Sequence, residues 1–262
     1  QVDCGRGLSG DFRMKKMTLM ALLLGVCVST QAAEVKLAIA ANFTKPMQDL
    51  APVYEKMTGD KLVMSFGATG ALYAQIKNGA PFDILLSADD KATVRAVTEG
   101  LGVEGSTFTY AIGKLVLWSK QADFVKDAKV LESEKVQKLA VADPKLAPYG
   151  VAAEETLRHL GLYEKLQPKF VIGGNIGKTY QFVSSENAQV GFIALSQCYK
   201  NGKFTEGSGW IVPAEYYNPI MQDGVLLTNG QNKEAAKKFI DFLKSSPEAD
   251  KVREAFGYAM VK

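Results

Sequence analysis

Short apolar runs alternate with helix-like patterns along most of the chain. Residues 35–41 (VKLAIAA) predict a strand, and apolar side chains then recur at spacings of three and four from Met47 to Met57, before Gly59. The same order of strand and helix repeats four times: a strand at 62–66 with a helix to Gly79, a strand at 83–86 with a helix to Gly100, a strand at 139–142 with a helix at 151–160, and a strand at 170–172 with a helix at 177–185. A further strand is predicted at 190–195. Since such alternation is typical of parallel sheets covered on both faces, the pattern predicts an α/β fold with largely parallel sheets.

The C-terminal part of the pattern differs. A β-rich stretch at 210–227 precedes two helical patterns, 233–244 and 247–256, and Ser246 is positioned to cap the second one. Residues 34–262 hold too many units for one simple open sheet. We therefore expect two lobes.

The N-terminal segment has the order of a secretory signal peptide. Lys15 and Lys16 precede the apolar run 19–28, and small residues follow at 30–33. The run is too short to span a bilayer. We expect residues 1–33 to be an upstream extension plus signal peptide, with export to the periplasm and a mature start at Ala33 or Glu34. A lipoprotein with acylated Cys27 is the alternative, and bulky Val26 before it argues against that.

Composition and charge indicate an ordinary soluble, folded protein. Apolar residues make up 47% of the chain and charged residues 23%, and mean hydropathy is −0.03. The formal net charge of +3 falls to +1 without residues 1–33, and no basic stripe remains, so no nucleic-acid partner is expected. Cys198 is the one cysteine of residues 34–262, which excludes an internal disulfide there.

The residue inventory does not favour an enzyme. His159 is the single histidine, and its place at the end of an amphipathic helix indicates a structural role. No Ser-His-Asp or Cys-His arrangement can be built around it, and a zinc-type site lacks ligands. The sequence also has no P-loop and no GxGxxG motif after a strand.

Four uncharged loops stand out where helices begin. They lie at 41–44, 67–71, 147–150 and 174–179, and Lys178 is the one charged residue among them. Helix N-termini and glycine-rich turns direct free backbone N–H groups at bound anions. Ordinary helix capping and turn formation by Thr44, Thr69 and Asn175 is the alternative. Without acidic residues, such loops suit a fully ionised oxyanion, which only accepts hydrogen bonds, better than a protonated phosphate.

The sequence resembles the periplasmic molybdate-binding proteins of ABC transporters from Val35 to Lys262. The matching stretches are AANFTKPMQDLA (40–51), FGATGALYAQIKNGAPFDILLSAD (66–89), VADPKLAPYG (141–150), GGNIGKT (173–179) and VGFIALS (190–196). The resemblance implies a monomeric two-lobed class II periplasmic binding protein with the ligand cleft between its lobes, no cofactor, and a membrane permease as partner. It places one lobe at 34–112 plus 218–262 and the other at 113–217, with crossings near Gly113 and Asn218.

By matched position, the resemblance implies four oxyanion ligands: Asn42, Thr69, Tyr149 and the backbone amide of Ile176. Asn42 and Thr69 stand where serines are common in the family, and Ala194 stands where a tyrosine often donates. Tyr149 would donate through its hydroxyl or locally through its backbone. Lys45 and Lys178 are expected to point to solvent.

Other functions remain open at this point. Molybdate, tungstate and, less favoured, sulfate or chromate share a tetrahedral dianionic shape. A ferric-ion site of the same fold would use Tyr216 and Tyr217, although such sites commonly need carboxylate or histidine help. An exported enzyme would use Asp83, Asp89 or Asp90, which capping explains more simply.

Overall fold

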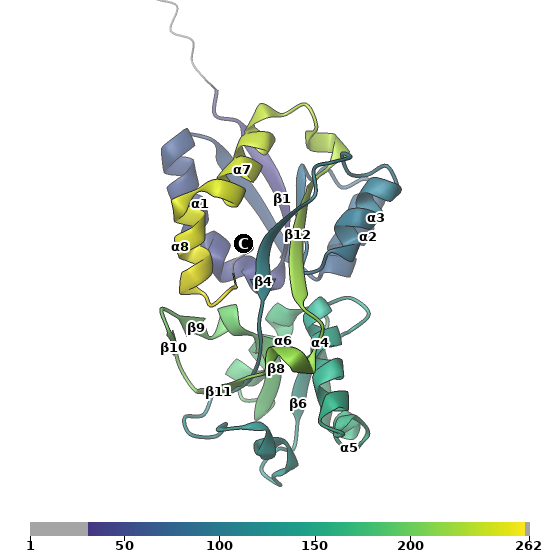
Figure 1. Ribbon diagram of the computed structural model, residues 1–262, viewed down its shortest axis with the longest axis vertical. Coiled ribbons are helices and arrows are strands. Elements are labelled where there is room, and N and C mark those ends of the chain that lie inside the picture. The colour runs from purple at the N-terminus through teal and green to yellow at the C-terminus, as the bar shows by residue number, and fades with distance from the viewer. Residues whose placement is uncertain (1–30, 260–262) are drawn as a thin grey trace, which may run out of the picture. The chain divides into compact units, whose positions relative to one another are not determined.

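The computed structural model describes residues 31–259. Residues 1–30 of the predicted extension and signal peptide lie outside the described residues. Within residues 31–259, no helix is long and apolar enough to cross a membrane. The described chain forms two lobes, each built on a five-stranded sheet with helices on its faces (Figure 1).

The first sheet has the strand order β2-β1-β3-β12-β4. Its strands are β1 (Glu34–Ala40), β2 (Lys61–Gly67), β3 (Ile84–Leu86), β4 (Phe108–Gly113) and β12 (Ile220–Leu226). Its helices are α1 (Thr44–Thr58), α2 (Thr69–Lys77), α3 (Lys91–Thr98), α7 (Glu234–Ser245) and α8 (Pro247–Ala255). Alternate residues of β1 serve the two faces: Leu37 packs in the cluster that includes α1 and α7, and Ala38 packs in the cluster of α2.

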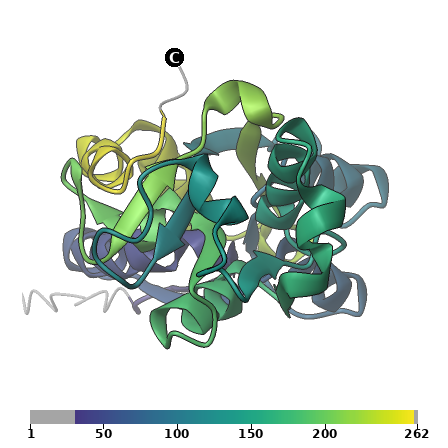
Figure 2. The ribbon, with the colours of Figure 1, turned by 90° about the horizontal axis from the view of Figure 1, so that it is seen from below.

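The second sheet has the order β11-β5-β8-β6-β7. Its strands are β5 (Leu115–Ser119), β6 (Leu139–Ala142), β7 (Phe170–Gly173), β8 (Val190–Ala194) and β11 (Ser208–Ile211), with helices α4 (Pro148–His159), α5 (Tyr163–Leu166) and α6 (Ile176–Ser184). A small hairpin joins β9 (Tyr199–Lys200) to β10 (Lys203–Phe204). Figure 2 shows this teal and green lobe from below.

The connections between the sheets define the cleft. The chain leaves the first sheet after Gly113 and enters the second at Leu115, and it returns after β11 through residues 212–219 into β12. The two crossing strands lie side by side, because Ile220 of β12 pairs with Gly113 of β4. The two lobes are therefore joined by a two-stranded connection.

The α/β pattern is confirmed, but the expectation of largely parallel sheets is wrong. β1 pairs in parallel with β2 and β3, and β6 with β7 and β8, whereas β12 and β5 run antiparallel to their neighbours. The antiparallel strands are those next to the crossings, where the chain turns back between sheets. The predicted cap is confirmed: Ser246 Oγ accepts from the Ala249 amide at 3.0 Å.

Candidate functional site

The four predicted ligand residues meet at one small cavity in the cleft. Asn42, Thr69, Tyr149 and Ile176 all line it, and every residue of its lining is uncharged. Its volume is about 10 Å³, against about 580 Å³ for the open groove that shares Thr69, Ala88, Ala147 and Pro148 with it. So small a space excludes a drug-sized organic ligand, whose pockets usually exceed about 300 Å³.

Asn42 lies in the short 3-10 helix η1 (Ala41–Phe43) that follows β1, and it is 1% exposed. Its Oδ1 accepts a hydrogen bond from the Tyr258 hydroxyl at 2.7 Å, and its backbone oxygen accepts from Ser196 Oγ at 2.7 Å. Its Nδ2, in contrast, is buried without a partner among the described residues. An unpaired buried amide costs about 1–3 kcal/mol, so this cavity has a donor in need of an acceptor.

Thr69 is the first residue of α2, and its hydroxyl donates to no acceptor among residues 31–259. Its Oγ1 accepts from the Ala88 amide at 3.0 Å, and α2 has no side-chain cap. Thr44 donates to the Ala41 carbonyl oxygen at 2.7 Å, and α1 likewise has no side-chain cap. Neither threonine caps its helix, although Thr44 has the expected turn role through its bond to Ala41. The Thr69 hydroxyl can donate into the cavity.

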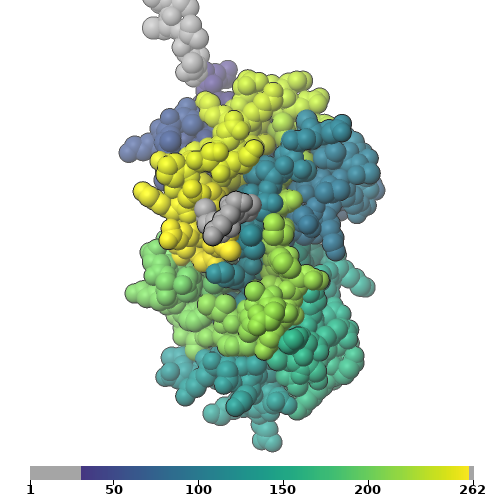
Figure 3. Space-filling view, in the orientation of Figure 1, coloured from purple at the N-terminus to yellow at the C-terminus, as the bar shows by residue number. Residues whose placement is uncertain are grey.

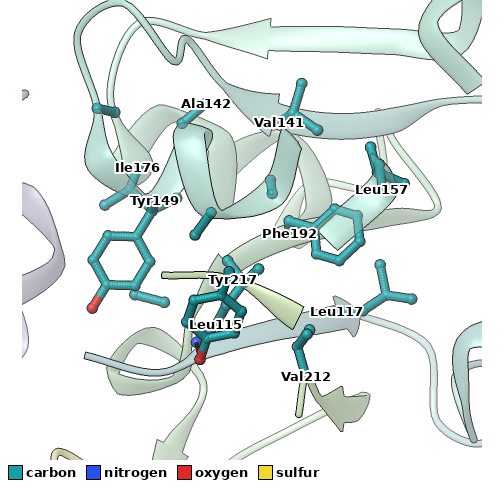
Figure 4. Packing of buried hydrophobic residues seen from close by; sticks show 14 of the residues in the cluster. Leu115, Leu117, Val141, Ala142, Tyr149, Leu157, Ile176, Phe192, Val212 and Tyr217 are labelled. Carbon is teal, nitrogen blue, oxygen red and sulfur yellow. Dashed lines mark hydrogen bonds between the residues drawn. The ribbon is translucent and has the colours of Figure 1, made fainter. Parts of the chain in front are cut away.

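Tyr149 follows Pro148 in the first turn of α4, which also has no side-chain cap. Its hydroxyl donates to Gln222 Oε1 at 2.7 Å, and burial raises the pKa of this hydroxyl well above its ordinary value. In Figure 4 the hydroxyl points away from the other side chains of the second-lobe core, while Ile176 lies beside the Tyr149 ring. The hydroxyl proton is thus held by Gln222, which leaves the backbone amide as the donor of Tyr149.

Ile176 begins α6, and the predicted cap of that helix is confirmed because Asn175 Oδ1 accepts from the Lys178 amide at 2.8 Å. This cap does not use the Ile176 amide. Among residues 31–259, the backbone amides of Thr69, Tyr149 and Ile176 have no acceptor, as expected for first-turn positions. Three helix N-termini thus present amides and positive dipole ends where these residues line the cavity.

A buried polar network behind the cavity was missed by sequence reasoning. Gln222 Nε2 donates to the Tyr110 hydroxyl at 3.0 Å, and Tyr110 donates to the Ser87 carbonyl oxygen at 2.8 Å. Gln222 could have been noticed, because it occupies a buried position in the alternating strand β12. Nothing in the local sequence marks Tyr258, whose partner Asn42 is 216 residues away.

The two lysines near the loops differ. Lys178 is exposed, as expected. The expectation that Lys45 points to solvent is wrong: it is half-buried, its Nζ donates to the Gln197 carbonyl oxygen, and it lies 4.9 Å from the Tyr180 ring centroid. Burial lowers the pKa of Lys45. Its ammonium group links α1 to the second lobe instead of lining the small cavity.

The acidic candidates for catalysis have structural partners. Asp83 is fully buried and accepts from the Lys36 amide at 2.8 Å and from Lys233 Nζ at 3.0 Å. Asp89 accepts from the Ala92 amide at 2.9 Å at the start of α3, while Asp90 is exposed. Capping is thus the role of Asp89.

The tyrosine pair proposed for iron is used elsewhere. Tyr217 Oη accepts from the Leu115 amide at 3.1 Å at the first crossing, and Tyr216 stacks on His159 with ring centroids 4.0 Å apart. Residues 31–259 contain no cluster of three or more His, Cys, Asp or Glu side chains that could hold a metal ion. Cys198 is buried, which raises the pKa of its thiol.

Comparison with known proteins agrees with this architecture. Residues 35–259 match the family model described as bacterial extracellular solute-binding protein. The chain is 51% identical over 233 residues to the molybdate-binding protein ModA of Azotobacter vinelandii, covering 88% of this chain and 92% of the relative. It is 46% identical to ModA of Rhodobacter capsulatus, covering 92% and 94%.

A solved structure shows the same likeness. The periplasmic molybdate-binding protein of Azotobacter vinelandii superposes with a TM-score of 0.84 at 38% identity, covering 87% of this chain and all of the other. These relatives carry the names of binding proteins, not of enzymes. The chain belongs to the family of bacterial extracellular solute-binding proteins.

Proposed function

We propose that this chain captures molybdate, and also tungstate, in the small cavity and delivers it to an ABC transporter permease. The observation that carries this proposal is the donor set: the unpaired Asn42 Nδ2, the Thr69 hydroxyl, and first-turn amides at Thr69, Tyr149 and Ile176. A fully ionised tetrahedral dianion accepts hydrogen bonds at every oxygen and offers none back. The names of the close relatives support molybdate as the dianion.

The absence of charge from the lining supports an oxyanion held by dipoles. Neutral donors avoid the cost of burying a cationic side chain, and helix N-termini supply partial positive charge. A protonated phosphate would need an acceptor for its hydrogen, and no carboxylate lines the cavity. The chain acts as a binding protein without catalysis, and the groove beside the cavity is the route by which the ion enters.

The lobes and the compartment follow from the same proposal. One lobe comprises 34–112 and 218–262 and the other 113–217, and they meet around the ion. Residues 1–33 direct export to the periplasm, and the mature chain acts as a monomer. The similarity of this chain to a solved periplasmic protein supports this location.

Competitive calorimetric titration with molybdate, tungstate, sulfate and chromate tests the ligand. All four ions have the same charge and shape but differ in radius, so the titration compares how well each radius fits the cavity. We expect molybdate and tungstate to bind most tightly. Tighter binding of sulfate would contradict the molybdate proposal.

An isosteric variant tests the donor set. Asn42→Asp replaces the unpaired Nδ2 with an anionic oxygen, and it should weaken molybdate binding by about a hundredfold or more through repulsion at close range. Asn187→Asp on the exposed surface is the matched control and should bind normally. Normal binding by Asn42→Asp would contradict the placement of the ion at this cavity.

A further inference from the structure

The C-terminal segment enters the ligand site through Tyr258. This residue follows α8 and is buried, and its ring packs edge-on against Phe43 with centroids 5.4 Å apart. Its hydroxyl lies 2.7 Å from Asn42 Oδ1 and 3.1 Å from the Asn42 backbone oxygen. Tyr258 is therefore the neighbour that contacts both oxygens of a residue lining the cavity.

The backbone on both sides of Tyr258 is held in place. Gly257 has a φ of 81°, in the left-handed region that favours glycine, and its Cα faces Leu195 of the second lobe. Ala259 exchanges two backbone hydrogen bonds with Ile112 of β4, at 3.0 and 3.2 Å. At the end of α8, the Ala255 carbonyl oxygen accepts from the Asn201 amide, where the yellow helix meets the light-green hairpin in Figure 3. The hydroxyl of Tyr258 consequently has a fixed position.

An asparagine side chain can present either its oxygen or its NH₂ group to a ligand, since rotation about its last torsion exchanges them. The Tyr258 hydroxyl has one proton, and the nearest acceptor for it is Asn42 Oδ1. The backbone oxygen of Asn42 already accepts from Ser196. With Oδ1 engaged by Tyr258, the NH₂ group is the end that remains for the cavity, and it is the end without a partner.

We propose that Tyr258 is a positioning residue that orients the Asn42 amide so that it donates to a dianion. The inference rests on the proposed function. Turning the amide over would place an oxygen against the anion, so the hydroxyl of Tyr258 selects for ligands that only accept hydrogen bonds. Burial raises the pKa of Tyr258, which keeps this hydroxyl protonated and donating.

Calorimetric titration of Tyr258→Phe with sodium molybdate tests the proposal. The variant removes the donor that lies 2.7 Å from Asn42 Oδ1 and leaves the Tyr149 hydroxyl, at 3.5 Å, as the remaining one. Because the Tyr149 proton is held by Gln222 at 2.7 Å, we expect affinity to fall about ten- to a hundredfold. Tyr54→Phe is the matched control, because the Tyr54 hydroxyl is also buried but has no partner among the described residues. Its affinity should equal that of the unsubstituted chain.

A double-mutant cycle separates positioning from general loosening. In the Asn42→Ala background, Tyr258→Phe should cause less than about a twofold further loss, because its target is gone. The side-chain NH₂ signals of Asn42 in the nitrogen-15 spectrum of the complex, identified by their loss in Asn42→Ala, should shift in Tyr258→Phe and not in Tyr54→Phe. Unchanged affinity of Tyr258→Phe, or an equal loss in both backgrounds, would overturn the proposal. Failure of the unsubstituted chain to bind molybdate would instead contradict the proposed function.

Discussion

The Thr69 hydroxyl is the side-chain donor whose contribution is simplest to isolate. Its oxygen is held by the Ala88 amide, so its proton is directed away from that contact and is available to an anion. Thr69→Ala should weaken molybdate binding by about 1–3 kcal/mol, the cost of losing one buried hydrogen bond to a charged group. Calorimetric titration measures this loss directly.

The control at this scale is Lys178→Ala, which removes an exposed charge from the same group of loops. Screening by salt limits the reach of such a charge, so its effect should be smaller than that of Thr69→Ala at low and at high ionic strength. A larger effect of Lys178, growing as salt is removed, would indicate a charge-driven site. Lys45 is a poorer control, because it bonds across the lobes.

The elements that join the lobes are packed closely around Tyr149. A Cβ atom at Gly113 would lie 2.7 Å from Gln222 Oε1 and 2.9 Å from Tyr149 Cζ, inside contact distance. Gly113→Ala should therefore displace the Tyr149 hydroxyl from Gln222 and cost about 1–3 kcal/mol of stability. Urea unfolding measures the loss, and molybdate affinity should fall with it because α4 moves. Gly174→Ala, where a Cβ meets open space, should be neutral; an equal loss there would contradict this packing argument.

Helices α2 and α3 are joined by a carboxylate whose titration should be visible in stability. The Tyr73 hydroxyl donates to Glu99 at 2.7 Å and Arg95 donates at 2.9 Å, and these bonds lower the pKa of Glu99 from 4.5 to about 2. A carboxyl whose pKa is lower in the folded state stabilises the fold at pH values above its pKa in the unfolded chain. That contribution is lost as the pH falls towards the folded-state pKa.

Between pH 4.5 and about 2, the free energy of unfolding should therefore decline more steeply for the unsubstituted chain than for Glu99→Gln. Urea unfolding at a series of pH values checks this. Tyr73→Phe removes the hydrogen bond that contributes most to the lowered pKa, so it should also flatten the decline. Parallel curves for all three proteins would contradict the assignment.

Sequence patterns predicted most of the elements, but they missed strands β4 and β5 and gave no long-range pairing. Strand alternation and helix spacing are local, which is why the α/β class and the Asn175 and Ser246 caps could be read from neighbouring residues. The antiparallel placement of β12 depends on partners more than 100 residues away in β3 and β4. The orientation of Asn42 likewise depends on Tyr258, and no local pattern connects the two.

At the scale of the whole molecule, the proposed ligand residues are divided between the lobes. Asn42 and Thr69 follow strands of the first sheet, while Tyr149 and Ile176 begin helices of the second lobe. The lobes are also joined directly: the Gly70 amide donates to the Leu146 carbonyl oxygen at 3.0 Å. An exposed ion pair, Lys200 with Asp49 at 2.6 Å, adds a contact of the kind that is worth at most about 1 kcal/mol.

Hydrogen bonds from Ser196 to Asn42, from Lys45 to Gln197 and from Tyr149 to Gln222 also join the lobes in this structure. We expect the two crossing strands to act as a hinge about which these contacts open and close. A dianion that bonds to both lobes favours the closed arrangement by the free energy of those added bonds. Small-angle scattering should therefore show a smaller radius of gyration when saturating molybdate is added. Asn42→Asp, which should not hold the ion, provides the control and should show no change. An unchanged radius of gyration in the unsubstituted chain, under conditions where calorimetry shows saturation, would contradict closure by the ligand and would mean that the lobes are already together before the ion binds.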